Sequence, residues 1–205
     1  MRIIDLTHPI VGGMPVYFPW HPATEWVQTA NYKEHNCVVH RLTIGTHSGT
    51  HIDAPSHIFE GMHHIDAYDL SFWYSEAQVL DFTHRDKCEA ITGAEMAEKD
   101  VEEGIGVIIK TGWDMYFGRE DYYKSYPALS KEGGEILIRK NVKYLGADTP
   151  FNMEIHKMFL SRGKPLITNL KNLDEIHRRR VRLIAAPLLL KDGDGSPARV
   201  FAIED

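Results

Sequence analysis

Four residues that can bind a metal ion or carry a proton lie close together near the first quarter of this chain. They are His47, His51, Asp53 and His57, in the segment His-Ser-Gly-Thr-His-Ile-Asp-Ala-Pro-Ser-His. Imidazole nitrogens and carboxylate oxygens suit zinc, manganese or iron. A histidine-rich surface loop is the alternative interpretation, but so dense a group favours a metal site, and we expect hydrolytic chemistry from it.

The backbone of this segment is predicted to be a bent strand or loop. His47 and His51 are four residues apart and could share one face of a helix, but Gly45, Gly49 and Pro55 interrupt helices rather than continue them. In an extended strand, residues on one face are spaced roughly 6.5 to 7 Å apart. We therefore expect a turn near Gly49 to gather the four side chains.

Length and composition predict one domain over residues 1–205. The chain has 205 residues, of which 43% are hydrophobic and 25% charged, enough for one good core. The net charge of -6 and the lack of a basic stretch beyond Arg178-Arg179-Arg180 exclude nucleic acid as the expected partner. A small-molecule substrate is expected instead.

Location is predicted from what the sequence does not contain. No apolar run approaches the roughly 20 residues that span a bilayer, and the first residues lack the apolar core of a secretion signal. The two cysteines, Cys37 and Cys88, have no CxxC spacing and fit free thiols in a reducing compartment. We expect a cytoplasmic protein without a membrane partner.

Strand and helix patterns alternate along the chain, which predicts a mixed α/β domain. Helices are expected over 92–103, with the capping box Thr92-Gly-Ala-Glu95, over 130–141 and over 152–162. Strands are expected over 2–6, 37–46, 105–110, 143–147, 165–170, 181–190 and 199–203. The strand over 37–46 should lead into the histidine segment, and residues 192–197 should form a turn rather than a calcium loop.

Aromatic side chains are the candidates for holding a substrate. The loop over residues 14–22 is rich in proline and aromatic residues, and it could be a hydrophobic lid on the core or an aromatic wall over a pocket. Phe18, Trp20 and Phe59 could stack on an aromatic or heterocyclic substrate, although plain packing is the commoner role of such residues.

The histidine segment resembles the signature of the metal-dependent cyclase-like hydrolases, the family of bacterial kynurenine formamidase. The resemblance extends over nearly the whole chain. It includes Asp5-Leu-Thr-His-Pro-Ile, Gly146-Ala-Asp-Thr-Pro150, Asn169-Leu-Lys-Asn-Leu-Asp-Glu175 and Asp194-Gly-Ser-Pro-Ala-Arg199. It implies a swivelling β/β/α domain, with a mixed sheet and flanking helices, and a homodimer or a higher homo-oligomer.

The resemblance also implies roles for individual residues. His47, His51 and Asp53 correspond to metal ligands, and His57 corresponds to the catalytic histidine. His156 matches a histidine that serves a second metal in two-zinc members, although a supporting role beside the site is its alternative. Zinc is the expected metal, with manganese as the alternative.

Two departures from the family pattern affect these expectations. Thr168 stands where the formamidases carry a glutamate, and a neutral hydroxyl should bind a second cation weakly or not at all. One tightly bound ion is therefore predicted. The loop Tyr17-Phe-Pro-Trp-His-Pro22 also differs from the Tyr-Pro-Gly-Asp-Pro of many formamidases, which leaves the substrate open.

The predicted function is hydrolysis of an amide by metal-activated water, with His57 as general acid and base. The resemblance favours an aryl formamide such as N-formylkynurenine, an intermediate of tryptophan catabolism. A cyclic-amide hydrolase of the isatin type would use the same chemistry. A non-catalytic metal- or ligand-binding protein on the same scaffold is the alternative from another class, but binding alone would not need His57.

Overall fold

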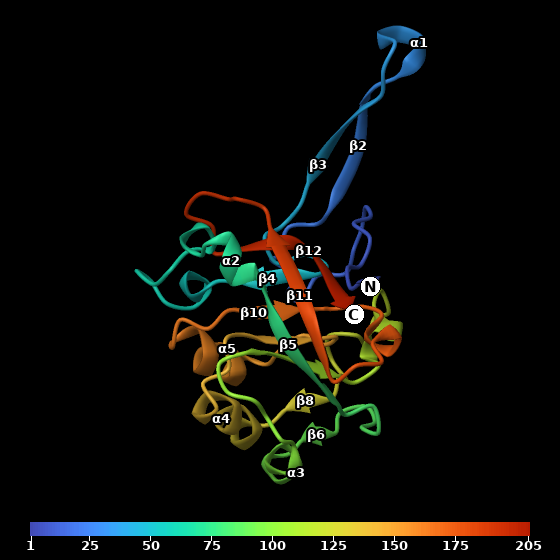
Figure 1. The fold of residues 1–205 in the computed structure, drawn as a ribbon. Coiled ribbons are helices and arrows are strands. Elements are labelled where there is room, and N and C mark those ends of the chain that lie inside the picture. Colours follow the sequence, from blue (N-terminus) through green and yellow to red (C-terminus); the bar gives the residue numbers. More distant parts are fainter.

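A mixed eight-stranded sheet forms the centre of the structure, a computed structural model that describes residues 1–205 (Figure 1). Its strands are β1 (Arg2–Asp5), β4 (His51–Asp53), β5 (Tyr74–Asp81), β7 (Gly106–Lys110), β9 (Leu145–Ala147), β10 (Leu166–Thr168), β11 (Arg180–Pro187) and β12 (Gly195–Glu204). Their order is β1-β12-β11-β5-β7-β9-β10-β4, and β4 also pairs with β12. The sheet thereby closes into a barrel-like ring. The predicted mixed sheet is confirmed.

Strand direction changes around the ring. β5, β7, β9 and β10 are parallel neighbours, whereas β1, β11, β12 and β4 join through antiparallel pairs. The parallel strands are linked by segments that contain α3 (Gly93–Glu98), α4 (Lys131–Arg139) and α5 (Met153–Leu160). Figure 1 shows these three helices on one side of the sheet. They are the flanking helices that the sequence predicted.

Two apolar clusters occupy the two faces of the sheet, and strand β7 contributes side chains to both of them. Ile108 belongs to the cluster inside the ring, while its neighbours Val107 and Ile109 belong to the cluster beneath the helices. Successive side chains of a strand point to opposite faces, so a strand covered on both sides reads as a continuous apolar run. The helices complete the second cluster with Leu137, Ile155 and Phe159.

Local sequence signals identify where the helices begin, but not always where they end. Thr92 and Glu95 form the predicted capping box of α3, and Ser130 and Asn152 cap α4 and α5. The prediction that the first helix reaches residue 103 is wrong, since α3 ends at Glu98. Lys99 adopts an extended conformation, and Val101 is buried in the second cluster. Tertiary packing outweighs the weak helix propensity of this stretch.

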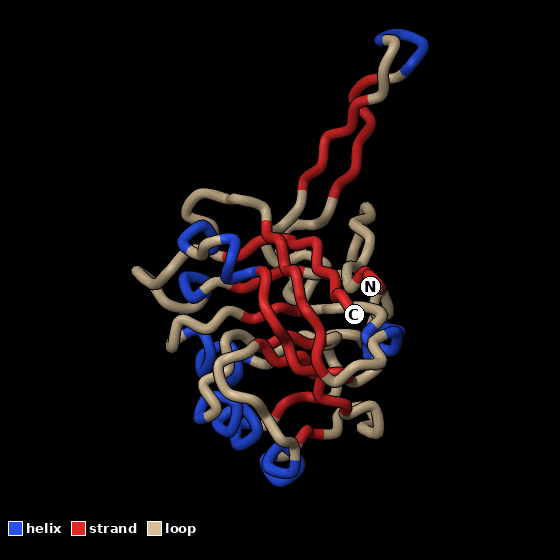
Figure 2. Tube along the Cα trace, in the orientation of Figure 1, coloured by secondary structure: helices blue, strands red, loops and turns tan.

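Residues 25–43 form an arm that projects from the body (Figures 1 and 2). β2 (Glu25–Ala30) pairs with β3 (Val39–Thr43), and α1 (Tyr32–His35) lies at the tip. The predicted strand over 37–46 is present and leads towards His47, but it belongs to this arm and not to the central sheet. We call residues 25–43 the arm below.

The remaining short elements lie between the strands of the central sheet. They are α2 (Leu70–Trp73), the small sheet of β6 (Ala90–Ile91) with β8 (Ala128–Leu129), and 3-10 turns at Pro55–His57, Ile65–Ala67, Trp113–Tyr116 and Leu173–Glu175. No helix of the structure has the length and apolar character needed to cross a membrane.

Candidate metal centre and pocket

Strand β4 carries the centre of the site. His51 and Asp53 lie two residues apart and share one face of the strand, while Ile52 points into the core. Before the strand, Gly49 has a φ of +62°, a conformation that favours glycine. This turn brings His47 back onto the same face, so that its Nδ1 lies 2.7 Å from Asp53 Oδ1. The predicted turn at Gly49 is confirmed.

Asp53 is the point on which three histidines converge. His47 Nδ1 and His51 Nε2 lie 2.7 and 3.3 Å from Asp53 Oδ1, and His156 Nε2 lies 3.3 Å from Oδ2. Asp53 is 1% exposed. Its Oδ2 is buried and has no well-aligned hydrogen bond beyond the 3.3 Å contact with His156, which is costly for a carboxylate oxygen unless a cation satisfies it.

In each of these histidines, the second ring nitrogen is held by an acceptor. His51 Nδ1 lies 2.8 Å from the carbonyl oxygen of Gly49, and His156 Nδ1 lies 2.9 Å from that of Asn152. His47 Nε2 lies 2.8 Å from Asp194 Oδ2. Such outer contacts orient histidine ligands in metal sites. The donors that remain, imidazole nitrogens and carboxylate oxygens, fit zinc or manganese.

The electrostatics of the cluster favour a negatively charged Asp53 beside a positively charged His47. Burial alone would raise the pKa of Asp53, but the charge of His51 and the hydrogen bonds from His156, His47 and His51 together outweigh burial and hold that pKa well below its usual range. Burial alone would lower the pKa of His47, but its hydrogen bonds to Asp194 and Asp53 raise the pKa to about 9. Asp53 therefore remains an ionised carboxylate, which can accept hydrogen bonds or bind a cation.

His57 stands beside the cluster on the 3-10 turn that follows β4. Pro55 begins this turn, and the His57 ring centroid lies 3.8 Å from that of His47. His57, Asp53 and His156 have ligand atoms within 4.8 Å of one another. The His57 side chain is 24% exposed, more than the other histidines of the cluster, so it can reach both the cluster and a molecule in the pocket.

Thr168 occupies the position next to His51 on the neighbouring strand. The two residues pair directly across β4 and β10, and Thr168 Oγ1 lies 2.8 Å from His51 Nε2. A carboxylate at this position would face the same cluster. In this chain the position offers only a hydroxyl, which is 2% exposed.

A cavity of about 260 Å³ opens over the histidines. One wall comes from the loop before the arm, where the rings of Phe18 and Trp20 stack at 4.3 Å. The opposite wall includes Phe151 and Met153 at the start of α5, and Tyr123 also lines the space. An aromatic wall next to charged groups suits a small molecule with one apolar and one polar end.

Five predicted metal and catalytic residues line this cavity: His47, His51, Asp53, His57 and His156. Thr168, which stands where the formamidases carry a glutamate, lines it as well. Phe18 and Trp20 also line it, and Trp20 is 74% exposed. Phe59 does not line the cavity and instead packs against the second apolar cluster, because the turn at 55–57 directs it away from the pocket.

Asp194 contacts the histidine cluster but is not among the residues that the sequence predicts for the site, and neither are Tyr123, Phe151 and Met153 of the cavity wall. The turn predicted over 192–197 is shorter in the structure, because β12 begins at Gly195, and a turn alone indicates no role for Asp194. It lies far from the histidines in sequence, and only the β4–β12 pairing brings it to His47. The one available signal was its position at the start of the family-like string Asp194-Gly-Ser-Pro-Ala-Arg199.

Comparisons with known proteins agree with this geometry. The Cyclase family model matches residues 4–151. The kynurenine formamidase of Erythrobacter litoralis is 28% identical over 99% of this chain and 94% of its own length. A solved structure described as a potential metal-dependent hydrolase with cyclase activity is 28% identical and has a TM-score of 0.81, covering 100% of this chain and 99% of its own.

An isatin hydrolase bound to the product analogue thioisatinate superposes with a TM-score of 0.87 at 22% identity, over 98% of this chain and 91% of its own, and supports the fold. The family match covers well over half of the chain. The chain belongs to the cyclase family of metal-dependent hydrolases.

Proposed function

We propose that this protein hydrolyses an aryl formamide such as N-formylkynurenine. The observation that carries the proposal is the convergence of His47, His51 and His156 on the buried Asp53, with His57 beside them at the floor of an aromatic-walled cavity. Kynurenine formamidases that align over nearly the whole chain support the substrate. The cavity volume of about 260 Å³ favours a small substrate.

The proposed metal is zinc, with manganese as the alternative, held by His47, His51 and Asp53. A bound divalent cation polarises a carbonyl group and lowers the pKa of water, which is the chemistry that amide hydrolysis needs. The residues of the chain supply orientation. Carbonyl groups and Asp194 hold the outer nitrogens of the histidines.

His57 is proposed to move the protons. In hydrolysis, the formyl carbon gains a bond to the oxygen of water and loses its bond to nitrogen, so water gives up a proton and the departing amine gains one. An imidazole can accept and return that proton near neutral pH. The stacked Phe18 and Trp20 are proposed to hold the aryl group.

Steady-state kinetics with two substrates test this proposal. We expect turnover of N-formylkynurenine, and replacing His57 with alanine should lower kcat by about 10²- to 10⁴-fold while metal content stays unchanged. His63→Ala is the matched control, since His63 is an exposed histidine of the same loop outside the cavity. Turnover of isatin but not of N-formylkynurenine would indicate a cyclic-amide hydrolase instead of a formamidase. Metal binding without turnover of either substrate would favour a non-catalytic binding protein.

We propose that one metal ion is tightly bound. The hydroxyl of Thr168 next to His51 replaces the carboxylate that a second cation would need. Metal counting after dialysis should give one equivalent for the wild type and two for Thr168→Glu. Ser161→Glu adds the same charge at the exposed end of α5 and should leave one equivalent. Two equivalents in the wild type would contradict the proposal.

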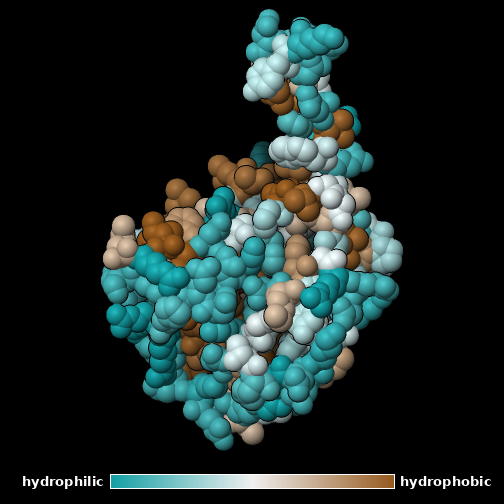
Figure 3. All heavy atoms as spheres, turned by 90° about the vertical axis from the view of Figure 1, so that its right-hand side faces the viewer, coloured by the Kyte–Doolittle hydropathy of each residue, from teal (hydrophilic) through white to brown (hydrophobic).

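A homodimer is the proposed assembly, and the arm is its proposed contact. An isolated two-stranded hairpin is marginally stable in water, yet the arm exposes several large apolar side chains: Trp26, Val27, Tyr32, Val38, Val39 and Leu42. Apolar atoms also gather where the arm meets the body (Figure 3). A second copy of the chain offers the same surface in return, as a two-fold dimer requires.

The proposed location is the cytoplasm. Cys37 and Cys88 are both exposed and unpaired, which suits a compartment that keeps thiols reduced. Fractionation of cells that produce the protein tests this proposal, because recovery outside the cytoplasmic fraction would contradict it.

A further inference from the structure

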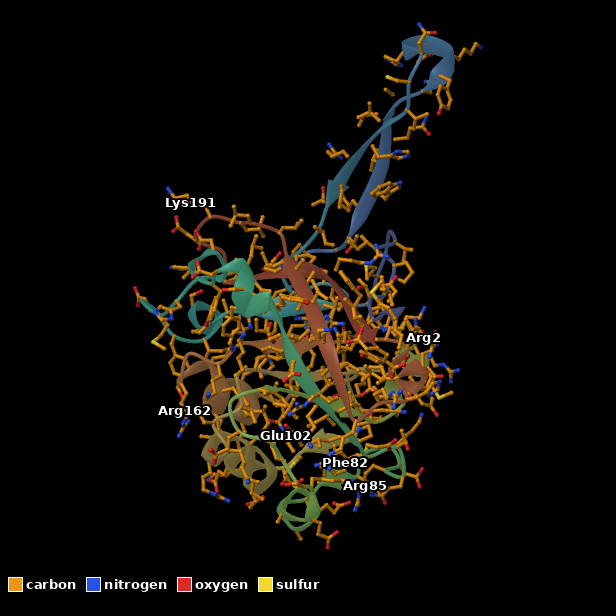
Figure 4. All side chains as sticks on the ribbon, viewed as in Figure 1. Arg2, Phe82, Arg85, Glu102, Arg162 and Lys191 are labelled. Carbon is orange, nitrogen blue, oxygen red and sulfur yellow. The ribbon has the colours of Figure 1, made fainter.

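The loop between β11 and β12 runs out from the body and returns directly onto the metal centre. Figure 4 shows Lys191 at its outer end. The loop returns at Asp194, whose carbonyl oxygen accepts a hydrogen bond of 3.0 Å from the backbone N–H of Ala54. The next residue, Gly195, pairs with Asp53. The backbone of Asp194 is therefore fixed against the strand that carries the proposed ligands.

The side chain of Asp194 reaches His47 from the side opposite Asp53. Its Oδ2 lies 2.8 Å from His47 Nε2, whereas His47 Nδ1 lies 2.7 Å from Asp53 Oδ1. The imidazole ring is held at both nitrogens and cannot flip without losing both contacts. The same Oδ2 lies 3.5 Å from His57 Nδ1, at the outer limit for a hydrogen bond, so the contact with His47 is the stronger one.

Of the three histidines around Asp53, only His47 has its outer nitrogen held by a carboxylate. His51 also contacts a neutral side chain, since Thr168 Oγ1 lies 3.0 Å from its Nδ1. The carbonyl groups of Gly49 and Asn152 hold His51 and His156. A backbone carbonyl cannot be removed by substitution, but a carboxylate can. A carboxylate behind a histidine ligand fixes its tautomer and makes the ligand more basic.

We infer that Asp194 is a positioning residue of the metal centre, which holds His47 with Nδ1 directed at the cation. The inference rests on the proposed metal site and adds to it a residue at the end of the loop that precedes β12. Asp194 does not line the cavity over the histidines. It acts through His47, so its loss should weaken metal binding even where the fold survives.

Zinc affinity of the metal-stripped protein tests the inference, measured by competition with a chromophoric chelator. Asp194→Ala should raise the zinc dissociation constant by about 10- to 100-fold. Asp194→Asn keeps an oxygen that accepts the hydrogen bond without its charge, and should lie between alanine and wild type. Asp192→Asn is the matched control, because Asp192 is an exposed aspartate of the same loop, and its zinc affinity should equal that of the wild type.

The outcomes separate this inference from the proposed function. Zinc affinity of Asp194→Ala within twofold of the Asp192→Asn control would overturn it and leave the hydrolase proposal standing. Absence of both zinc and manganese binding by the wild type would overturn both. Thermal unfolding of the metal-free variants identifies a merely structural role, which would lower the Tm of the variants but leave their zinc affinities equal to that of the wild type. If Asp194→Ala does not fold, Asp194→Asn decides.

Discussion

At the scale of single residues, four neighbours in sequence indicate the site, but its completion depends on residues far away. The types and spacing of His47 to His57 predict a metal centre, and Gly49 predicts the turn that gathers them. Asp194 and His156 come to the site only through strand pairing and helix placement. No local pattern could supply those contacts, so the resemblance indicated His156 and nothing in the spacing indicated Asp194.

His8 provides a prediction about pH at the residue scale. Its side chain is 5% exposed and stacks on Phe117 at 3.9 Å, and its Nε2 is buried without a partner. Burial, and then the charge of Lys171, lower its pKa from 6.5 to about 4. The unfolded chain therefore binds a proton more readily than the folded one, and the protein loses stability as the pH falls from 6.5 towards 4.

The loss amounts to about 2 kcal/mol between pH 7 and pH 5 for this one group. Other groups titrate over the same interval, so the difference between wild type and His8→Phe isolates the contribution. Urea unfolding at both pH values should show the wild type losing about 2 kcal/mol more than the variant. Equal losses in the two proteins would mean that His8 is not held neutral by the fold.

At the scale of secondary structure, sequence patterns show which segments are strands better than they show which strands pair with each other. The β-branched run before His47 is a strand as predicted, yet its partner is β2 in the arm and not a strand of the central sheet. The pattern of one strand carries little information on pairing, because register depends on which face is buried, and all five residues of β3 are exposed.

The close approach of β12 to β4 is an element-scale feature that a substitution can test. A Cβ atom at Gly195 would lie 2.6 Å from the carbonyl oxygen of Ile52 and 2.7 Å from Cε1 of His47. Because the first contact is with backbone, the strands must separate, and Gly195→Ala should lower the free energy of unfolding by about 1–3 kcal/mol.

The same displacement should weaken zinc binding, since it moves His47. Gly12→Ala is the control, because the nearest atoms to its added Cβ lie at 3.9 Å, an ordinary contact distance. It should change stability by less than about 0.5 kcal/mol. If the Gly195→Ala protein were as stable as that control, β12 and β4 would not be in close steric contact at this position.

At the scale of the whole molecule, the resemblance predicts the sheet with flanking helices, and the sequence patterns do not predict that the sheet closes. Closure depends on β4 pairing with both β10 and β12, and β4 is only three residues long. A strand this short, between a glycine turn and Pro55, has too few residues to show the alternation of apolar and polar residues that indicates a strand. The arm is likewise visible only in three dimensions (Figure 2).

The dimer proposal makes a prediction at this scale. Trp26 and Leu42 lie opposite each other on β2 and β3 and are 55% and 41% exposed. If these side chains contact a second copy, Trp26→Ser with Leu42→Ser should convert the dimer to monomers in light scattering at micromolar concentration. Gln28→Ser, on the same strand, should remain dimeric. A monomeric wild type, or a double variant that stays dimeric, would contradict the proposal.

The protein is proposed to be an amide hydrolase whose activity depends on a metal ion bound at Asp53. Titration of the metal-stripped protein with zinc, followed by the hydrolysis of N-formylkynurenine, tests this claim most directly. We predict that hydrolysis is absent without metal, rises in proportion to added zinc and reaches a plateau at one equivalent. Hydrolysis by the metal-free protein at the rate of the zinc-loaded protein would contradict the claim.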